Sequence, residues 1–249
     1  MYFFYIEMMR CIILPDSCTT SGIVALTIDE GPTAYTNEIL DILEKKGVPA
    51  TFHFNPSITG GEFQGIYDRA EDEGHEIGMR TSPKREYNDD MAYSEVEDDL
   101  NQQLNFVQSR TSNKIKFARS PKNGDLPIEN VYNYFTKKSI IQSSYSINPQ
   151  EDPSVDPVDR IKEFLGPNNY KYDSFIIQLY EQKLQEDRNL EEIIDAIAEN
   201  HYKFVVMSEC LDGYKAGEPV SRKGRSSKSS ATSCILPPTL VPVVMFLMS

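Results

Sequence analysis

Short apolar runs alternate with longer amphipathic segments along most of this chain. The short runs are rich in β-branched and aromatic residues, which predicts strands. The longer segments repeat apolar residues every three or four positions, which predicts helices. We expect strands at residues 23–28, 50–54, 76–78, 115–117, 140–141, 174–180 and 204–207. We expect helices at residues 36–47, 64–72, 94–107, 127–137, 158–165 and 190–197.

About seven strand and helix units follow one another in this pattern. Such alternation predicts an α/β fold, in which crossover helices connect the strands of a parallel sheet. Both a barrel and a doubly wound sheet satisfy the pattern. The chain has 249 residues and no linker near its middle, so a single (β/α) barrel is favoured.

The two ends of the chain differ from this body. Residues 1–17 begin with an apolar stretch that Glu7 and Arg10 interrupt, and we interpret them as either a secretory signal or an N-terminal strand. Residues 18–215 form the predicted domain. Residues 216–233 are small, polar and basic, which is typical of a polar linker.

Residues 234–249 are apolar to the last position. They are too short to span a membrane, and their prolines would break a helix. The order of small residues, polar spacer and apolar tail is typical of a glycolipid-anchor (GPI) signal, with residues 226–230 as candidate attachment positions. We prefer this interpretation, which attaches the protein to a membrane, over a frayed hydrophobic end.

Charge is distributed unevenly along the chain. The formal net charge is −13 for the whole chain and +3 for residues 216–249, which leaves −16 for residues 1–215. An acidic body without basic clusters argues against nucleic-acid binding, because phosphate neutralisation needs Lys and Arg.

The four cysteines are Cys11, Cys18, Cys210 and Cys234. None forms a C-x-x-C pair, which argues against a zinc finger and a thioredoxin-like site. If both ends are removed by processing, Cys18 and Cys210 remain as a pair, which indicates one disulfide and an oxidising compartment. Four unpaired thiols are the alternative.

Polar residues follow several predicted strands, where parallel β/α folds place their chemistry. Asp29 and Glu30 come directly after the first strand and precede a Gly-Pro turn. Adjacent carboxylates in this position are typical of a metal or acid/base site. An acidic turn that caps the next helix is the structural alternative.

Six segments between Cys18 and Leu211 together resemble one family. They read LTIDEGPT, ATFHFN, GHEIGMRT, FARSP, FIIQLYE and FVVMSECL, and their order and spacing are similar to those of polysaccharide deacetylases. This family, also called NodB-homology or carbohydrate esterase family 4, includes chitin deacetylases. The resemblance implies a distorted (β/α) barrel that removes acetyl groups from N-acetylglucosamine polymers such as chitin, using zinc or another divalent metal.

The resemblance also implies roles for individual residues. The catalytic base falls on Asp29, and the neighbouring metal-ligand aspartate falls on Glu30. The two metal-ligand histidines fall on Arg80 and Lys84, whose protonated side chains cannot bind a cation. Arg119 matches the arginine that supports the base.

Three further positions follow from the same resemblance. Pro121 matches a proline of a substrate-binding motif. Tyr180 stands where the family has its catalytic-acid histidine, and with an ordinary pKa near 10 a tyrosine is a poor proton donor at pH 7. The family's Asp-x-x-Asp-Trp segment falls near residues 146–150, where only Asn148 is a plausible counterpart.

The resemblance also implies a disulfide. The family's fungal-type members pair cysteines at positions that match Cys18 and Cys210.

None of the three histidines is expected to replace the lost ligands. We interpret His53 as a packed core residue, His75 as structural and His201 as solvated.

We therefore expect an extracellular protein of the cell surface or cell wall that has lost metal binding and deacetylase activity and needs no cofactor. Arg80, Lys84 or both are predicted to ion-pair with Asp29 or Glu30. The polysaccharide is its expected partner. One alternative is an active metal-dependent deacetylase with atypical ligands; another is an unrelated reaction that uses Asp29, Arg119 and Tyr180.

Overall fold

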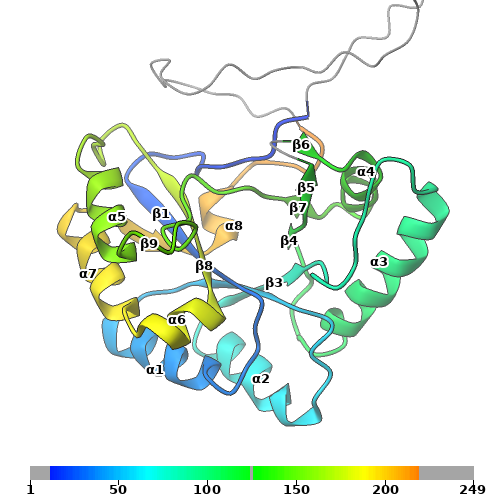
Figure 1. Cartoon of the computed structure of the whole chain (residues 1–249), viewed down its shortest axis with the longest axis horizontal. Coiled ribbons are helices and arrows are strands. Elements are labelled where there is room, and N and C mark those ends of the chain that lie inside the picture. The colour runs from blue at the N-terminus through cyan, green and yellow to red at the C-terminus, as the bar shows by residue number, and fades with distance from the viewer. Residues whose placement is uncertain (1–11, 124–125, 219–249) are drawn as a thin grey trace, which may run out of the picture. The chain divides into compact units, whose positions relative to one another are not determined.

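The structure is a computed structural model and describes residues 12–123 and 126–218 (Figure 1). The predicted tail at 234–249 lies outside the described residues, as do residues 1–11 and most of the predicted linker at 216–233. Residues 12–17 form no strand. No helix among the described residues is long and apolar enough to cross a bilayer.

One parallel sheet of seven strands forms the centre of the domain. Its order is β7-β4-β3-β2-β1-β8, and β9 pairs with the first half of β1. Every neighbouring pair in this sheet is parallel. The strands are β1 (Ile23–Asp29), β2 (Thr51–Phe54), β3 (Glu76–Arg80), β4 (Phe117–Arg119), β7 (Ile141–Gln142), β8 (Phe175–Tyr180) and β9 (Lys203–Val205). A separate antiparallel pair consists of β5 (Lys122–Asn123) and β6 (Leu126–Pro127).

The sheet curls until the segment after β7 reaches β8. The backbone N–H of Ser146 donates to the carbonyl of Ile176 (2.8 Å), and the N–H of Gln178 donates to the carbonyl of Ile147 (3.0 Å). This irregular contact replaces a regular strand pair between the two edges. The predicted α/β class and distorted barrel are therefore confirmed.

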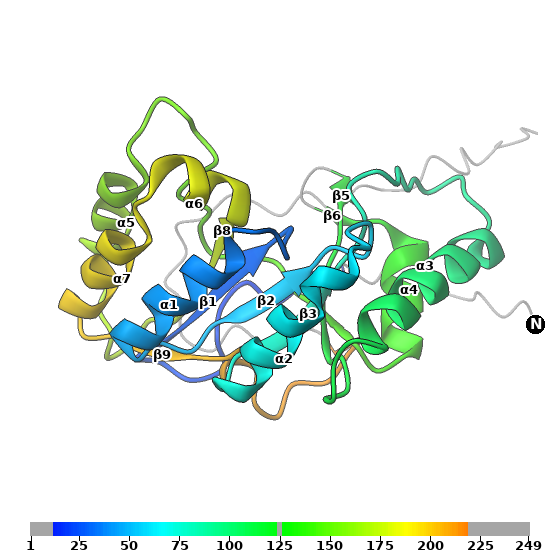
Figure 2. The same ribbon diagram turned by 90° about the horizontal axis from the view of Figure 1, so that it is seen from below.

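Helices cover the outside of the sheet, with α1 and α2 beneath β1 to β3 in Figure 1 and in front of them in Figure 2. All six predicted helices are present, with ends shifted by a few residues. Two short helices, α6 and α8, were not predicted, and the strand expected at 204–207 stops at Val205. The helices are α1 (Thr36–Lys46), α2 (Gln64–Asp72), α3 (Tyr93–Gln108), α4 (Glu129–Lys137), α5 (Pro157–Leu165), α6 (Glu181–Asp187), α7 (Leu190–Glu199) and α8 (Met207–Cys210), with a 3₁₀ turn at Gly61–Phe63.

Alternation along each strand separates the main core from the barrel interior. Because neighbouring side chains of a strand point to opposite faces, Leu26 and Ile28 of β1 pack outward into the core beneath the helices. Ala25 belongs instead to a smaller apolar cluster, which Phe117 and Cys210 share. The outward face of β1 is thus apolar, and its inward face is free to carry polar groups.

A disulfide between Cys18 and Cys210 ties the beginning of the domain to its end. The two Cα atoms are 4.5 Å apart, and 192 positions separate the residues in sequence. The predicted pairing is therefore confirmed. In the chain-entropy model, closing so long a loop contributes about 4–5 kcal/mol to stability.

Candidate functional site

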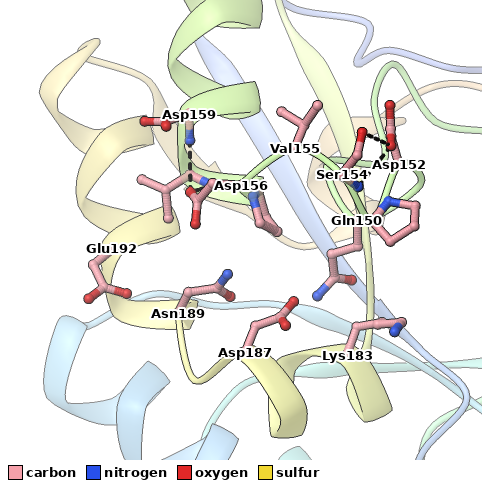
Figure 3. A pocket seen from close by; sticks show the side chains of 13 residues that line it. Gln150, Asp152, Ser154, Val155, Asp156, Asp159, Lys183, Asp187, Asn189 and Glu192 are labelled. Carbon is pink, nitrogen blue, oxygen red and sulfur yellow. Dashed lines mark hydrogen bonds between the residues drawn. The ribbon is translucent and has the colours of Figure 1, made fainter.

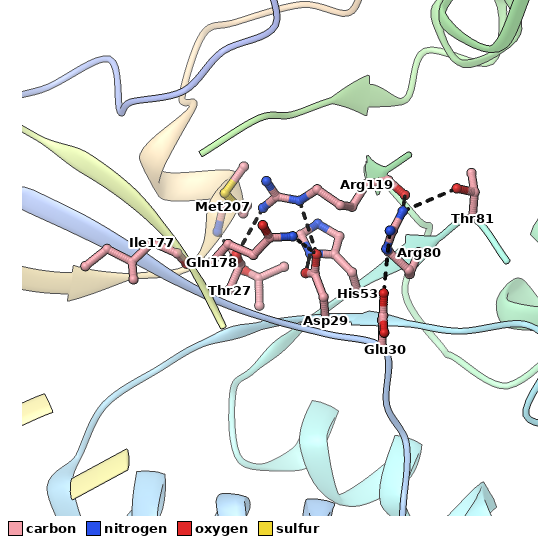
Figure 4. Close-up of polar contacts among 11 residues, drawn as sticks. Thr27, Asp29, Glu30, His53, Arg80, Thr81, Arg119, Ile177, Gln178 and Met207 are labelled. Atoms are coloured by element: carbon pink, nitrogen blue, oxygen red, sulfur yellow. Dashed lines mark hydrogen bonds and ion pairs between the residues drawn. The ribbon is translucent and has the colours of Figure 1, made fainter. Parts of the chain in front are cut away.

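Polar side chains meet where the inward-facing positions of several strands reach the carboxyl edge of the sheet. Parallel pairing places Asp29 level with His53 on one side and Tyr180 on the other. It also places Arg80 level with Arg119. Figure 4 shows the side chains of His53, Gln178 and Arg119 gathered around Asp29, with Arg80 beside Glu30. The inward-facing polar residues include Thr27, Asp29, His53, Arg80, Arg119, Gln178 and Tyr180.

Asp29 is fully buried, and both of its carboxylate oxygens have partners. Oδ1 lies 2.8 Å from Nδ1 of His53, and Oδ2 accepts a hydrogen bond from Nε2 of Gln178 (2.5 Å). Nε of Arg119 is 3.5 Å from Oδ2. Arg119 is held in turn by Thr27, whose hydroxyl accepts from Nη2 at 3.0 Å. Together these contacts balance the buried charge within the protein.

The electrostatics of this cluster favour an ionised Asp29. Burial by itself raises the pKa of this carboxyl, but the charge of Arg119 and the hydrogen bond from His53 outweigh burial and hold the pKa well below its usual range. Burial lowers the pKa of His53, against the attraction of Asp29. His53 is therefore neutral near pH 7 and donates its Nδ1–H to the carboxylate.

His53 was predicted to be a packed core residue, and its contact with the predicted base was not foreseen. The ring is fully buried, but it contacts Asp29 directly. Gly78 stands opposite it on β3, and a Cβ atom at that position would come within 2.6 Å of the His53 ring. A side chain at position 78 would therefore displace the imidazole.

Glu30 turns away from the strand and reaches the rim of the site. Its φ of 74° is left-handed, which ends the alternation of β1. Its Oε1 lies 3.5 Å from Nη2 of Arg80, with side-chain exposures of 34% and 14%. The predicted ion pair is thus confirmed for Arg80. Lys84 is exposed, and no ion pair within residues 12–123 and 126–218 involves it. Of the alternatives that the prediction allowed, Arg80 alone forms the pair.

Tyr180 occupies the end of β8 and is partly buried. Burial, reinforced by the charge of Asp29, raises its pKa to about 12. Its backbone N–H donates to Oε1 of Gln150 (2.6 Å). A phenol with this pKa holds its proton throughout the physiological range, which makes it a poor acid-base group.

Two other predicted positions stand apart from the Asp29 cluster. Pro121 follows β4 and is half-buried, and it is not among the residues whose side chains pair with Asp29. Asn148 is buried, and its Oδ1 accepts from the backbone N–H of Gln150 (2.9 Å), so it stabilises a local turn.

The residues present do not fit a divalent metal. Both oxygens of Asp29 are engaged by protein donors, and the guanidinium of Arg80 lies against Glu30. A guanidinium offers no lone pair to a cation and repels it. Residues 12–123 and 126–218 contain no group of three or more His, Cys, Asp or Glu that could hold a metal ion.

Comparison with known proteins identifies relatives of this domain. Residues 16–130 match the family model described as polysaccharide deacetylase. A chitin deacetylase from Pestalotiopsis sp is 43% identical over 67 residues, which are 26% of this chain and 22% of that relative. The alignment thus spans less than a quarter of the curated relative.

Solved structures share the fold over a longer stretch. The chitin deacetylase of Colletotrichum lindemuthianum is similar with a TM-score of 0.66 and 19% identity, covering 84% of this chain and 97% of that one. A CE4 family pseudoenzyme from Bacillus anthracis has a TM-score of 0.63 and 18% identity, covering 78% and 66%. A mutant of that pseudoenzyme with restored enzymatic activity is equally similar in fold, with a TM-score of 0.63, 19% identity and coverage of 78% and 68%.

Proposed function

This chain belongs to the polysaccharide deacetylase family, and from that premise we propose that it is a member that has lost metal binding and catalysis. The observation that supports this most is the pair of Arg80 with Glu30 beside a fully paired Asp29. The family's chemistry needs a metal to polarise the acetyl carbonyl and activate water. Here the guanidinium of Arg80 supplies the positive charge that balances Glu30. It cannot bind and activate a water molecule or polarise a carbonyl as a metal does.

The groups that would move protons are unsuited as well. A working deacetylase needs a base that can accept a proton near neutral pH and an acid that can donate one. The pKa of Asp29 lies below its usual range because of Arg119 and His53, so this carboxylate is a weak base. The raised pKa of Tyr180 makes it a weak acid. Loss of activity thus has two independent supports.

We propose that the protein works outside the cell, at the surface or in the wall, in contact with a chitin-like polysaccharide. The disulfide between Cys18 and Cys210 supports an oxidising compartment. The chitin deacetylase relative supports a polysaccharide partner. Attachment to a membrane through a lipid anchor added near residues 226–230 remains part of the proposal.

Metal content tests the proposed loss of function. The purified protein, equilibrated with zinc and then passed through a desalting column, is expected to retain far less than one zinc per chain by elemental analysis. It is also expected to release no acetate from N-acetylglucosamine oligomers. About one tightly held metal per chain, together with acetate release, would instead establish the active deacetylase with atypical ligands.

A repaired variant serves as the positive control. We expect Glu30→Asp combined with Arg80→His and Lys84→His to raise zinc affinity, because it restores the carboxylate and the two imidazoles that the family resemblance implies. We expect no recovery of deacetylation, because Tyr180 remains at the acid position. Recovered activity in this triple variant would show that Tyr180 is not the obstacle.

A further inference from the structure

A second polar site lies beside the barrel, between α5, α6 and α7. It is a pocket of about 760 Å³, within the roughly 300–1,000 Å³ typical of small-ligand sites. Its lining includes Gln150, Asn189 and Asp187 (Figure 3). Gln150 also binds the backbone of Tyr180, so this pocket adjoins the end of β8 without including the Asp29 cluster.

Two amide side chains in this pocket have unused hydrogen-bonding atoms. Gln150 and Asn189 are each only 7% exposed, and among the described residues neither Nε2 of Gln150 nor Oδ1 of Asn189 has a partner. Oε1 of Gln150 accepts from Tyr180, which directs Nε2 toward the pocket. Figure 3 shows both amides pointing into the space between the helices. Unpaired buried polar atoms are costly, so these atoms indicate a ligand that supplies an acceptor and a donor.

The charges around the amides select a cation. Five carboxylates and one lysine line the pocket, and Lys183 pairs with Glu186 (2.8 Å) outside it. No ion pair within the described residues involves any of the five, which are Asp152, Asp156, Asp159, Asp187 and Glu192. An unbalanced group of carboxylates attracts positively charged ligands.

Helix capping explains some of these carboxylates but not Asp187. Asp156 caps α5 by accepting from the N–H groups of Val158 and Asp159, and Glu192 lies in the first turn of α7. Acidic residues stabilise such helix N-termini. Asp187, however, is the last residue of α6, where a negative charge opposes the helix dipole. Its position beside Gln150 and Asn189 therefore points to a ligand.

We infer that this pocket binds a saccharide that carries primary amines, such as an oligomer of glucosamine. A hydroxyl group both donates and accepts, so sugar hydroxyls satisfy Nε2 of Gln150 and Oδ1 of Asn189 together. A protonated amine satisfies Asp187. Val155 and Val158 add apolar surface for the C–H face of a sugar ring. The inference rests on the proposed function only for the choice of a sugar polymer, because the pocket itself is observed independently.

Calorimetric titration tests the inference with three probes. A glucosamine oligomer, an N-acetylglucosamine oligomer of the same length and spermidine are each titrated into the purified full chain at low salt. We expect the glucosamine oligomer to bind at least about tenfold more tightly than the neutral N-acetylated one, as one charge-assisted contact implies. We expect spermidine, which has amines but no hydroxyls, to bind more weakly too.

Two variants locate the binding site. Asp187→Asn should weaken glucosamine-oligomer binding about tenfold. Asn189→Ala should reduce the ratio of the affinity for the glucosamine oligomer to the affinity for spermidine. The matched control Glu86→Gln removes one exposed carboxylate from the loop before α3 and should change the affinity less than about twofold. Thermal melting confirms that each variant is folded.

Several outcomes would overturn the inference. They are absence of glucosamine-oligomer binding, equal binding of spermidine or of the N-acetylated oligomer, and an equal effect of Glu86→Gln and Asp187→Asn. Equal binding of spermidine would indicate a simple acidic patch. Zinc content and acetate release are measured separately, so the proposed function and this inference can each fail alone.

Discussion

Two polar clusters lie next to each other in this domain and balance their charges in opposite ways. Around Asp29, each carboxylate oxygen meets a donor of the protein, and Arg119 compensates the charge. In the pocket beside α5, α6 and α7, carboxylates surround two unpaired amide atoms. In the first cluster the carboxylate itself is fully paired, although Nε2 of His53, Nη1 of Arg119 and Oε1 of Gln178 have no hydrogen-bond partner among the described residues. In the second, no ion pair of the described residues balances the carboxylates.

Burial explains why the two clusters differ. Asp29 and His53 are fully enclosed, and a charge in such a place must be paired because water cannot solvate it. Asp187 and Glu192 are exposed, so water stabilises them and the fold does not need to supply cations. A closed cluster thus acts as a structural element, and an open one remains available for binding. The predictions below test this contrast, beginning with the largest expected effect.

Arg119→Met should cause the largest loss of stability. It leaves Asp29 buried without its main opposite charge, and removing one partner of a buried pair typically costs about 3–5 kcal/mol. Urea denaturation measures the free energy of unfolding. The double variant Asp29→Asn with Arg119→Met should recover much of the loss. Arg160→Met is the matched control, because Arg160 pairs with Glu151 at 3.9 Å near the surface and should lose only about 0–1 kcal/mol. Equal losses at both arginines would contradict the contrast.

His53→Phe should cost about 1–3 kcal/mol by removing a donor from buried Asp29, and it should also change the pH dependence of stability. Burial lowers the pKa of His53 in the folded protein, whereas in the unfolded chain this histidine has its ordinary pKa near 6.5. Between these two pKa values the unfolded chain therefore binds more protons than the folded protein does. The stabilisation that neutral His53 provides is therefore fully present above about pH 6.5, and it is lost as the pH falls toward the pKa of His53 in the folded protein.

The pH dependence is measured by urea denaturation between about pH 5 and 7.5. One proton limits the slope to about 1.4 kcal/mol per pH unit. The slope should decrease in His53→Phe and persist in His201→Asn, which removes an exposed imidazole. His75 contributes with the same sign, because burial lowers its pKa too. An unchanged slope in His53→Phe would mean that folding does not shift the pKa of His53.

Arg80→Ala should have a moderate effect of about 1 kcal/mol. Its guanidinium is partly buried against Glu30 and donates to the carbonyl of Arg119 (3.3 Å), which places it between exposed and buried pairs. Lys84→Ala, the matched control, should stay within about 0.5 kcal/mol because this side chain is exposed. A larger loss at Lys84 than at Arg80 would overturn the assignment of Arg80 as the replacement cation.

Asp187→Asn should have the smallest effect on stability, within about 0.5 kcal/mol of the parent and in the stabilising direction. The change removes a negative charge from the end of α6 and from an acidic pocket. Thermal unfolding without ligand provides the measurement. A loss above about 1 kcal/mol would show that the pocket is structural, like the Asp29 cluster.

The alternation within strands was readable in the sequence and identified more of the site than we inferred from it. In ATFHF, Thr51 and His53 alternate with Phe52 and Phe54, just as Thr27 and Asp29 alternate with their apolar neighbours. This parity places His53 on the same face as Asp29. We interpreted His53 only as a packed core residue, because it lies in a predicted strand.

The two helices that were missed carry little local signal. Residues 181–187 read EQKLQED, with a single apolar residue and no break after β8. Residues 207–210 form a single turn. Helices this short depend on tertiary contacts, because helix nucleation is unfavourable in isolation.

By itself, the sequence predicted the strand and helix pattern, which follows from local periodicity. The resemblance of its motifs to polysaccharide deacetylases added the cation at position 80 and the pairing of Cys18 with Cys210. Only the tertiary structure decided that His53 and Gln178 bind Asp29, that Arg80 rather than Lys84 meets Glu30, and that Gln150 and Asn189 face one pocket. The physical reason is that strand order, register and sheet curvature set the distances between these side chains. Residues far apart in the chain establish these features together, so no local pattern records them.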